Sequence, residues 1–162
     1  MSVVLYKIDE RLVHGQVVAS FAKFLSADEF IVVNDKCAYD EDQITLMELA
    51  VPAGSELQVV TCAEYADIVK TDDFWGKKTI VVFRYLTDVM ECVELGVKIP
   101  SLNCAGFFQN KEKPNAVKYN NNLFLDDVDK ANLRKLPDMG VELYYQLTFV
   151  MQKSPLTSQV KF

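Results

Sequence analysis

Residues 5–21 read LYKIDERLVHGQVVASF, and this stretch decides the fold. It begins as an apolar run that ends at Ile8, which is typical of a buried strand. From Val13 onward, apolar residues return at helical spacing, at Val17 and Phe21. A strand that leads through a short polar loop into a helix is the first half of a β-α-β unit.

The same alternation continues along the chain. Short apolar runs occur at 2–8, 29–34, 56–60, 78–83 and 101–105, with helical stripes between most of them. Most runs lack polar alternation, which is typical of strands covered on both faces. We therefore predict an α/β fold with an open, mostly parallel sheet and helices on both faces. Residues 141–149 (VELYYQLTF) alternate in polarity, so we expect an edge or antiparallel strand near the C-terminus.

Composition narrows the class of protein. The 162 residues are 50% hydrophobic and contain no linker or repeat, so we predict one domain over 1–162. A net charge of −6 with no Lys/Arg cluster argues against nucleic-acid binding. The apolar runs are too short to cross a bilayer and no secretory signal is visible, so we expect a cytoplasmic protein. We predict no metal site, because the four cysteines form no CxxC pair and there is a single histidine. The sequence also contains no nucleotide-binding motif, so we predict no cofactor.

His14, the only histidine, follows the first predicted strand. Ligands of open α/β sheets bind beyond the carboxyl ends of the strands. His14 would stand directly before a helix, where the free backbone amides of Gln16 and Val17 and the helix dipole favour an anion. Gly15 would let the backbone approach such a ligand closely, and Arg11 adds a planar guanidinium suited to phosphate.

These groups suit phosphoryl transfer. A neutral imidazole is a competent nucleophile near pH 7, and this reaction needs mainly positioning and charge stabilisation. His14 would take a phosphoryl group and pass it on, while Asp9 or Glu10 would orient the ring or offset Arg11. On physical grounds alone, a loop histidine without function remains an equal alternative.

Three other side chains lie near predicted strand ends. Arg84 follows the run TIVVF, either as a solvated strand-end charge or as a further contact to phosphate or to an acidic partner surface. Cys37 and Cys104 have no flanking pair of basic residues that would lower the pKa of a thiol. We predict that both are structural thiols rather than sites of phosphorylation.

The segment KIDERLVHGQVV (7–18) resembles the active-site loop of the IIB component of the mannose/fructose/sorbose family of the bacterial sugar phosphotransferase system. The similarity continues through IVVNDKCAYD (31–40), ITLMELAVPAG (44–54) and residues 88–107. It implies that His14 is phosphorylated at Nδ1, with Asp9, Arg11 and Gln16 around the phosphate. After the fifth strand the chain departs from the family pattern, and a following basic residue falls at Lys111 or Lys113.

The resemblance also implies partners. A IIA protein would donate the phosphoryl group, and a sugar held by the membrane subunits IIC and IID would receive it. The protein would then be a protein-histidine sugar phosphotransferase that its partners recruit to the inner face of the cell membrane. The sugar (mannose, fructose, sorbose or an amino sugar) and a homo-oligomeric state are left open. The alternative is a non-catalytic regulatory or binding module of the same fold, but the intact DERLVHGQ loop favours the enzyme.

Overall fold

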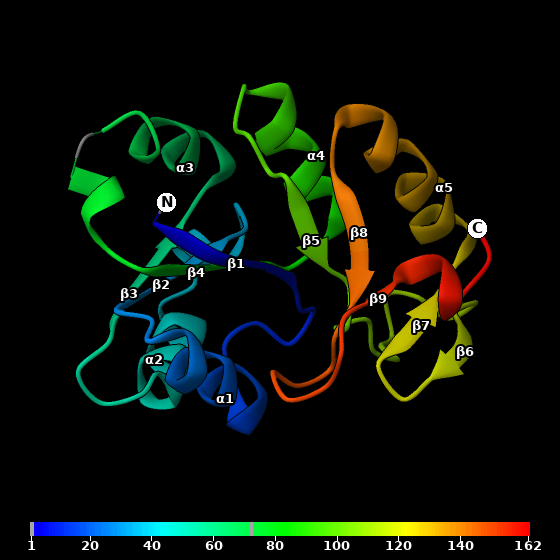
Figure 1. Cartoon of the computed structure of the whole chain (residues 1–162), viewed down its shortest axis with the longest axis horizontal. Helices are drawn as coiled ribbons and strands as arrows, with labels where there is room; N and C mark the ends of the chain where they lie inside the picture. The colour runs from blue at the N-terminus through cyan, green and yellow to red at the C-terminus, as the bar shows by residue number, and fades with distance from the viewer. Residues whose placement is uncertain (1, 72) are drawn as a thin grey trace.

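The computed structural model describes residues 2–71 and 73–162, apart from the side chains of Gln16, Val17 and Asp73. One seven-stranded sheet runs through the molecule in the order β3-β2-β4-β1-β5-β8-β9 (Figure 1). Its strands are β1 (Val3–Ile8), β2 (Glu29–Val33), β3 (Glu56–Val60), β4 (Thr79–Phe83), β5 (Ser101–Asn103), β8 (Glu142–Tyr145) and β9 (Ser154–Pro155). Every pairing described in this sheet is parallel except that of β8 with β9. The predicted mostly parallel sheet is confirmed.

Helices cover both faces of the sheet, as predicted (Figure 1). They are α1 (Gly15–Leu25), α2 (Glu41–Ala50), α3 (Cys62–Ile68), α4 (Leu86–Glu94) and α5 (Asp127–Lys135). Residues of α1 and α2 pack in one apolar cluster, and residues of α3, α4 and α5 pack in a second, larger one. Because a core lies on each side, every residue of β2 and β4 is buried. None of the helices described is long and apolar enough to span a membrane.

The C-terminal strand differs from the expectation in one respect. Residues 141–149 contain β8, but β8 pairs in parallel with β5 and lies inside the sheet. The antiparallel edge strand is β9, which pairs with β8. Tyr144 and Tyr145 are therefore both buried although they point to opposite faces. The strand ends at Tyr145, and the Gln146 side chain then donates to the Phe149 and Met151 carbonyls and closes a turn.

A small antiparallel hairpin lies outside the main sheet. Its strands are β6 (Val117–Asn120) and β7 (Leu123–Leu125). Phe107 bridges to Leu123, so the segment that follows β5 is tied to this hairpin. Short 3-10 helices complete the chain at Cys37–Tyr39, Asp73–Gly76, Leu136–Met139 and Leu156–Ser158.

The crevice of the sheet lies between the carboxyl ends of β1 and β5. After β1 the chain continues to β2, on the β4 side of β1, whereas after β5 it continues to β8, on the opposite side of the sheet. The direction of the strand order therefore reverses between β1 and β5. Gly106 brings the second loop against the first, and its carbonyl accepts from the Glu10 backbone amide at 2.9 Å. A Cβ at Gly106 would overlap the Ile8 carbonyl oxygen and lie 2.8 Å from Asp9 Cα. Only glycine permits this approach.

Gly106→Ala should therefore lower the free energy of unfolding by about 3 kcal/mol or more, because backbone atoms rather than a flexible side chain must move. Gly76→Ala is the matched control, since a Cβ there meets nothing within 4 Å, and it should change stability by less than about 0.5 kcal/mol. Urea denaturation of both variants measures the difference. Equal midpoints would contradict the packing described for Gly106.

Candidate functional site

The loop after β1 is short and tightly folded. Its first residue, Asp9, donates its backbone amide to the Phe83 carbonyl, and the Leu12 amide donates back to the Asp9 carbonyl at 2.9 Å. Leu12 takes a positive φ of 67°, which is uncommon for a residue with a side chain and costs about 1–3 kcal/mol. Its side chain is 2% exposed, so burial in the core holds the turn. The turn brings the side chains of the loop together.

Asp9 is the centre of the site. Its carboxylate is fully buried, and Oδ1 accepts from the backbone amide of Arg11 at 3.0 Å and from Arg11 Nε at 3.4 Å. His14 Nε2 lies 3.8 Å from the same oxygen, and Lys7 Nζ lies 3.5 Å from Oδ2. The sequence singled out Asp9, Arg11 and His14, and the structure places Arg11 and His14 beside the Asp9 carboxylate. Glu10 is turned away, because its carboxylate accepts from the Phe108 amide and from Lys113 Nζ.

The His14 ring is partly exposed, with one nitrogen buried toward Asp9. His14 is the N-cap residue of α1, but its side chain makes no capping hydrogen bond. The side chain is 31% exposed, whereas Nε2 is buried and has no hydrogen-bond partner among the described residues. Burial lowers the pKa of His14 below its usual value, the Asp9 carboxylate opposes that shift, and Arg11 reinforces it. A neutral ring with its proton on Nε2, toward Asp9, carries its lone pair on Nδ1.

This titration behaviour can be measured directly, because His14 is the only histidine. Its ring protons should titrate by NMR with a midpoint below 6.5. Asp9→Asn should lower the midpoint further and Arg11→Ala should raise it, since the first removes an attractive charge and the second a repulsive one. A lowered pKa in the folded state also means that stability contributed by this group is present above pH 6.5 and is lost as the pH falls. A wild-type midpoint at or above 6.5 would contradict this account.

The N-terminus of α1 lies beside the imidazole, because His14 is the N-cap residue of this helix. Gly15 is the first residue of the helix and has a positive φ of 55°. The first turn contains no acidic residue, so no side-chain charge compensates the positive end of the helix dipole. The backbones of Gln16 and Val17 belong to this turn, as expected, while their side chains lie outside the described residues.

Arg84 lies at the end of β4 and faces a cavity of about 310 Å³ that Arg11 also lines. His14 does not line this cavity. Arg84 Nη1 donates to Cys37 Sγ at 3.3 Å. Burial raises the pKa of the Cys37 thiol and raises that of the Cys104 thiol more strongly, to a value above its ordinary range. Both cysteines are buried, in keeping with structural thiols.

Sequence reasoning gave no role to two residues that shape the site. Lys7 is fully buried, and its Nζ donates to the Ala105 carbonyl at 2.7 Å, which joins the β1 end to the segment after β5. The position of a lysine inside an apolar strand could have indicated this linking role, because a buried charge needs polar partners. Phe108 stacks on Arg11, with Cζ 3.5 Å from the ring centroid. No local pattern pointed to that contact.

The two basic residues that follow β5, Lys111 and Lys113, have different surroundings in the structure. Lys113 forms buried ion pairs with Glu10 at 2.8 Å and with Asp129 at 3.0 Å, and its side chain is 11% exposed. Lys111 lines the cavity instead and is exposed. Lys113 therefore stiffens the second wall of the site, while Lys111 keeps its charge in contact with solvent.

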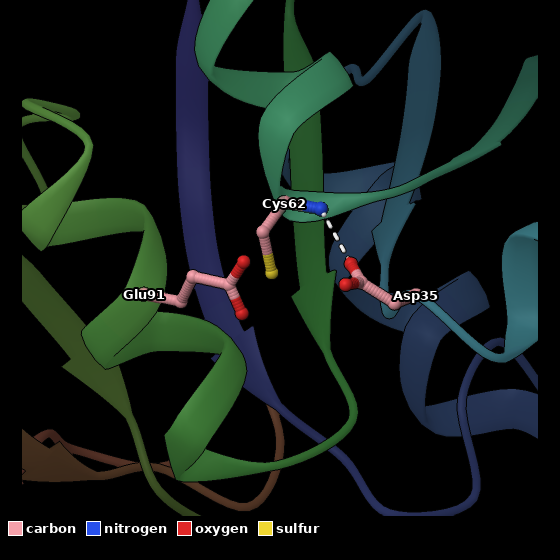
Figure 2. Close-up of side chains that lie close together, drawn as sticks. All are labelled: Asp35, Cys62 and Glu91. Atoms are coloured by element: carbon pink, nitrogen blue, oxygen red, sulfur yellow. Dashed lines mark hydrogen bonds between the residues drawn. The ribbon is translucent and has the colours of Figure 1, made fainter.

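A separate cluster joins Asp35, Cys62 and Glu91, whose ligand atoms lie within 4.8 Å of one another (Figure 2). Asp35 Oδ1 accepts from the backbone amide of Cys62 at 2.9 Å, and Cys62 Sγ donates to the Asp88 carbonyl. A hydrogen bond with Cys92, burial and nearby acidic groups raise the pKa of the Cys62 thiol far above its usual range. Exposed acidic side chains such as Asp35 and Glu91 are common without an ion, so we assign no metal chemistry to this cluster.

Comparison with known proteins gives a consistent family. Residues 3–161 match the family described as "PTS system sorbose subfamily IIB component". The sorbose-specific EIIB component of Klebsiella pneumoniae is 31% identical over 143 residues, which cover 88% of this chain and 85% of that protein. The mannose-specific EIIAB component of Escherichia coli (strain K12) is 34% identical over 143 residues, and the match spans only 43% of its length.

Solved structures agree with the fold. The IIBSor domain of the sorbose permease from Klebsiella pneumoniae superposes with a TM-score of 0.88 at 27% identity, over 98% of this chain and 96% of that one. A second match, titled "phosphoenolpyruvate-dependent phosphotransferase system", gives a TM-score of 0.86 at 25% identity and covers 98% of this chain and 96% of that one. The order of strands and helices is therefore that of a solved group of proteins.

Proposed function

Since this chain belongs to the sorbose-subfamily IIB components of the sugar phosphotransferase system, we propose that it carries a phosphoryl group on Nδ1 of His14 as an intermediate in sugar uptake. The observation that carries the proposal is the geometry of the ring. Nε2 is buried toward Asp9, and the side chain as a whole is 31% exposed at the start of α1. In the neutral ring with its proton on Nε2, the lone pair that attacks is on Nδ1.

The transfer takes two steps. In the first, Nδ1 of neutral His14 attacks the phosphorus of a phosphorylated donor, the N–P bond forms, and the donor's bond to phosphorus breaks. In the second, a sugar hydroxyl attacks the same phosphorus, the N–P electron pair returns to the imidazole, and the hydroxyl proton leaves to solvent. Both transition states place negative charge on the equatorial oxygens of the phosphoryl group.

The surrounding groups have distinct roles in this proposal. Arg11 stabilises the charge on the oxygens, and the backbone amides at Gly15, Gln16 and Val17 receive the phosphate at the helix end. Asp9 orients His14 and keeps Arg11 in place through its Oδ1. Arg84, across the cavity from Arg11, is a further contact for the anionic group.

The partners follow from the family. We propose a IIA protein as the donor, and the EIIAB name of the mannose-specific relative supports it, since a IIA part accompanies the IIB part in that protein. The acceptor is a sugar presented by membrane IIC and IID subunits. Residues 1–162 would act as one cytoplasmic IIB domain at the inner face of the cell membrane.

Phosphorylation with labelled phosphoenolpyruvate and the general phosphotransfer proteins, together with a cognate IIA protein, tests the function. The expected result is one equivalent of acid-labile, base-stable label per chain that is released on addition of IIC, IID and sugar. Absence of label with a IIA protein that phosphorylates another IIB component would favour the non-catalytic module instead.

A further inference from the structure

A cavity beside the His14 loop is lined by several side chains that have no role in the proposed phosphoryl transfer. It has a volume of about 310 Å³ and lies between the loop after β1, the end of β4 and the segment after β5. Its walls include Arg11, Arg84, Tyr85, Phe108, Asn110 and Glu112. A volume of this size lies at the lower end of the range for small-molecule sites.

Two guanidinium groups in this cavity are held by aromatic rings. Arg11 Cζ lies 3.5 Å from the centroid of Phe108, and Arg84 Cζ lies 5.2 Å from that of Tyr85. Within residues 2–71 and 73–162, Arg84 forms no ion pair, and its buried Nε has no hydrogen-bond partner. Arg11 is paired with the Asp9 carboxylate through Nε, whereas Arg84 donates only to the Cys37 thiol among the described residues and has no carboxylate partner. Stacking fixes both planar groups, and a fixed pair of guanidinium groups is suited to phosphate.

Two carboxylates line the cavity, and only that of Glu10 has a cationic partner among the described residues. Glu10 accepts from Lys113 at 2.8 Å and from the Phe108 amide at 2.9 Å. Glu112 accepts from the Tyr85 hydroxyl at 3.0 Å. Three cationic side chains, those of Arg11, Arg84 and Lys111, line the cavity against the two carboxylates of Glu10 and Glu112, although the chain as a whole carries −6. The cavity is therefore a local attractor for an anion.

The remaining wall is suited to hydroxyl groups rather than to a bare ion. Gln109 brings a carboxamide, which can both donate and accept hydrogen bonds. The Asn110 carboxamide is already engaged, because it donates to Glu10 and accepts from the backbone amides of Glu112 and Lys113. Tyr85 brings a flat apolar surface on which the C–H groups of a sugar ring can pack, whereas Arg11 already stacks on Phe108. A ligand that uses the whole cavity has a doubly charged group at one end and a small polyol at the other.

We infer that this cavity binds the phosphate monoester of a small sugar, with its phosphate between Arg11 and Arg84 and its hydroxyls toward Gln109. The inference rests on the proposed phosphotransfer function, because that function makes a sugar phosphate the product released next to His14. Arg11 belongs to both the His14 site and the cavity, since it contacts Asp9 through Nε and lines the cavity. The cavity then receives the product on its way from the imidazole to solvent.

Calorimetry on the unphosphorylated full chain tests this, with glucose 6-phosphate, mannose 6-phosphate, inorganic phosphate and the two free hexoses as probes. At least one ester should bind ~10-fold more tightly than inorganic phosphate, a difference of about 1.4 kcal/mol, and the free hexoses should produce no binding heat. Equal affinities for ester and inorganic phosphate would reveal an anion site only and overturn the sugar assignment. Lack of ester binding at tens of millimolar would overturn the inference altogether.

Variants locate the site. Arg84→Gln should weaken ester binding ~10-fold or more, and Arg84→Lys should fall between it and the wild type because it keeps the charge but loses the planar fork. Lys118→Gln removes an exposed charge from β6, a strand that does not line the cavity, and should bind as the wild type does. An Arg84→Gln variant that remains folded, by its thermal transition, and binds the ester normally would contradict the placement.

His14→Ala separates this inference from the proposed function. It should bind the ester within about twofold of the wild type, since His14 does not line the cavity. Wild-type protein that is labelled by phosphoenolpyruvate but binds no ester would refute the cavity assignment alone. Wild-type protein that binds the ester but takes no label would refute the phosphohistidine alone.

Discussion

His14→Ala is expected to accept no phosphoryl group at all, while its fold stays intact. The nucleophile is lost outright, and no second imidazole exists in the chain to replace it. The cost in stability should be below about 1 kcal/mol, because the ring is partly exposed and caps no backbone group. Labelling with phosphoenolpyruvate and thermal unfolding of the same preparation measure both effects.

His14→Asn is a useful companion, since its amide keeps a polar group near Asp9 but is not nucleophilic. It should be equally unable to take label. Label of normal stoichiometry on either variant would place the phosphoryl group on another side chain. Stability of that label in acid would then point to a hydroxyl rather than to a nitrogen or a thiol.

Arg11→Ala is expected to slow phosphoryl transfer ~100-fold or more, because a guanidinium fixed near developing charge stabilises the transition state more than the ground state. The side chain is 39% exposed, so its contacts with Asp9 and Phe108 should contribute about 1 kcal/mol or less to folding. Arg11→Lys should transfer at an intermediate rate, since it keeps the charge but loses the planar fork.

The competing account is that Arg11 only stiffens the loop through Asp9 Oδ1. In that case Arg11→Ala would unfold at a lower temperature yet transfer at the wild-type rate below its transition. Single-turnover transfer from a phosphorylated IIA protein, measured beside thermal unfolding, distinguishes the two. Lys118→Gln serves here too as a control for the general loss of one positive charge.

Local sequence determined the parts of the site that are close together in the chain. The run up to Ile8 and the apolar spacing from Val13 fixed a strand, a short loop and a helix in that order. Since the loop must then lie at the carboxyl end of its strand, the position of His14 at the start of α1 followed from local periodicity alone. The clustering of Asp9, Arg11 and His14 could be predicted from the sequence for the same reason.

Tertiary structure decided everything that joins distant parts of the chain. Glu10 reaches residues about a hundred positions away, at Phe108 and Lys113, and this is why Asp9 rather than Glu10 lies beside the imidazole. The parallel, interior position of β8 and the need for glycine at 106 depend on which strands are neighbours. The cavity between Arg11 and Arg84 likewise exists only because β4 and β5 flank β1. Strand order is set by the packing of the whole sheet and its two helical layers, and no local pattern of residues encodes it.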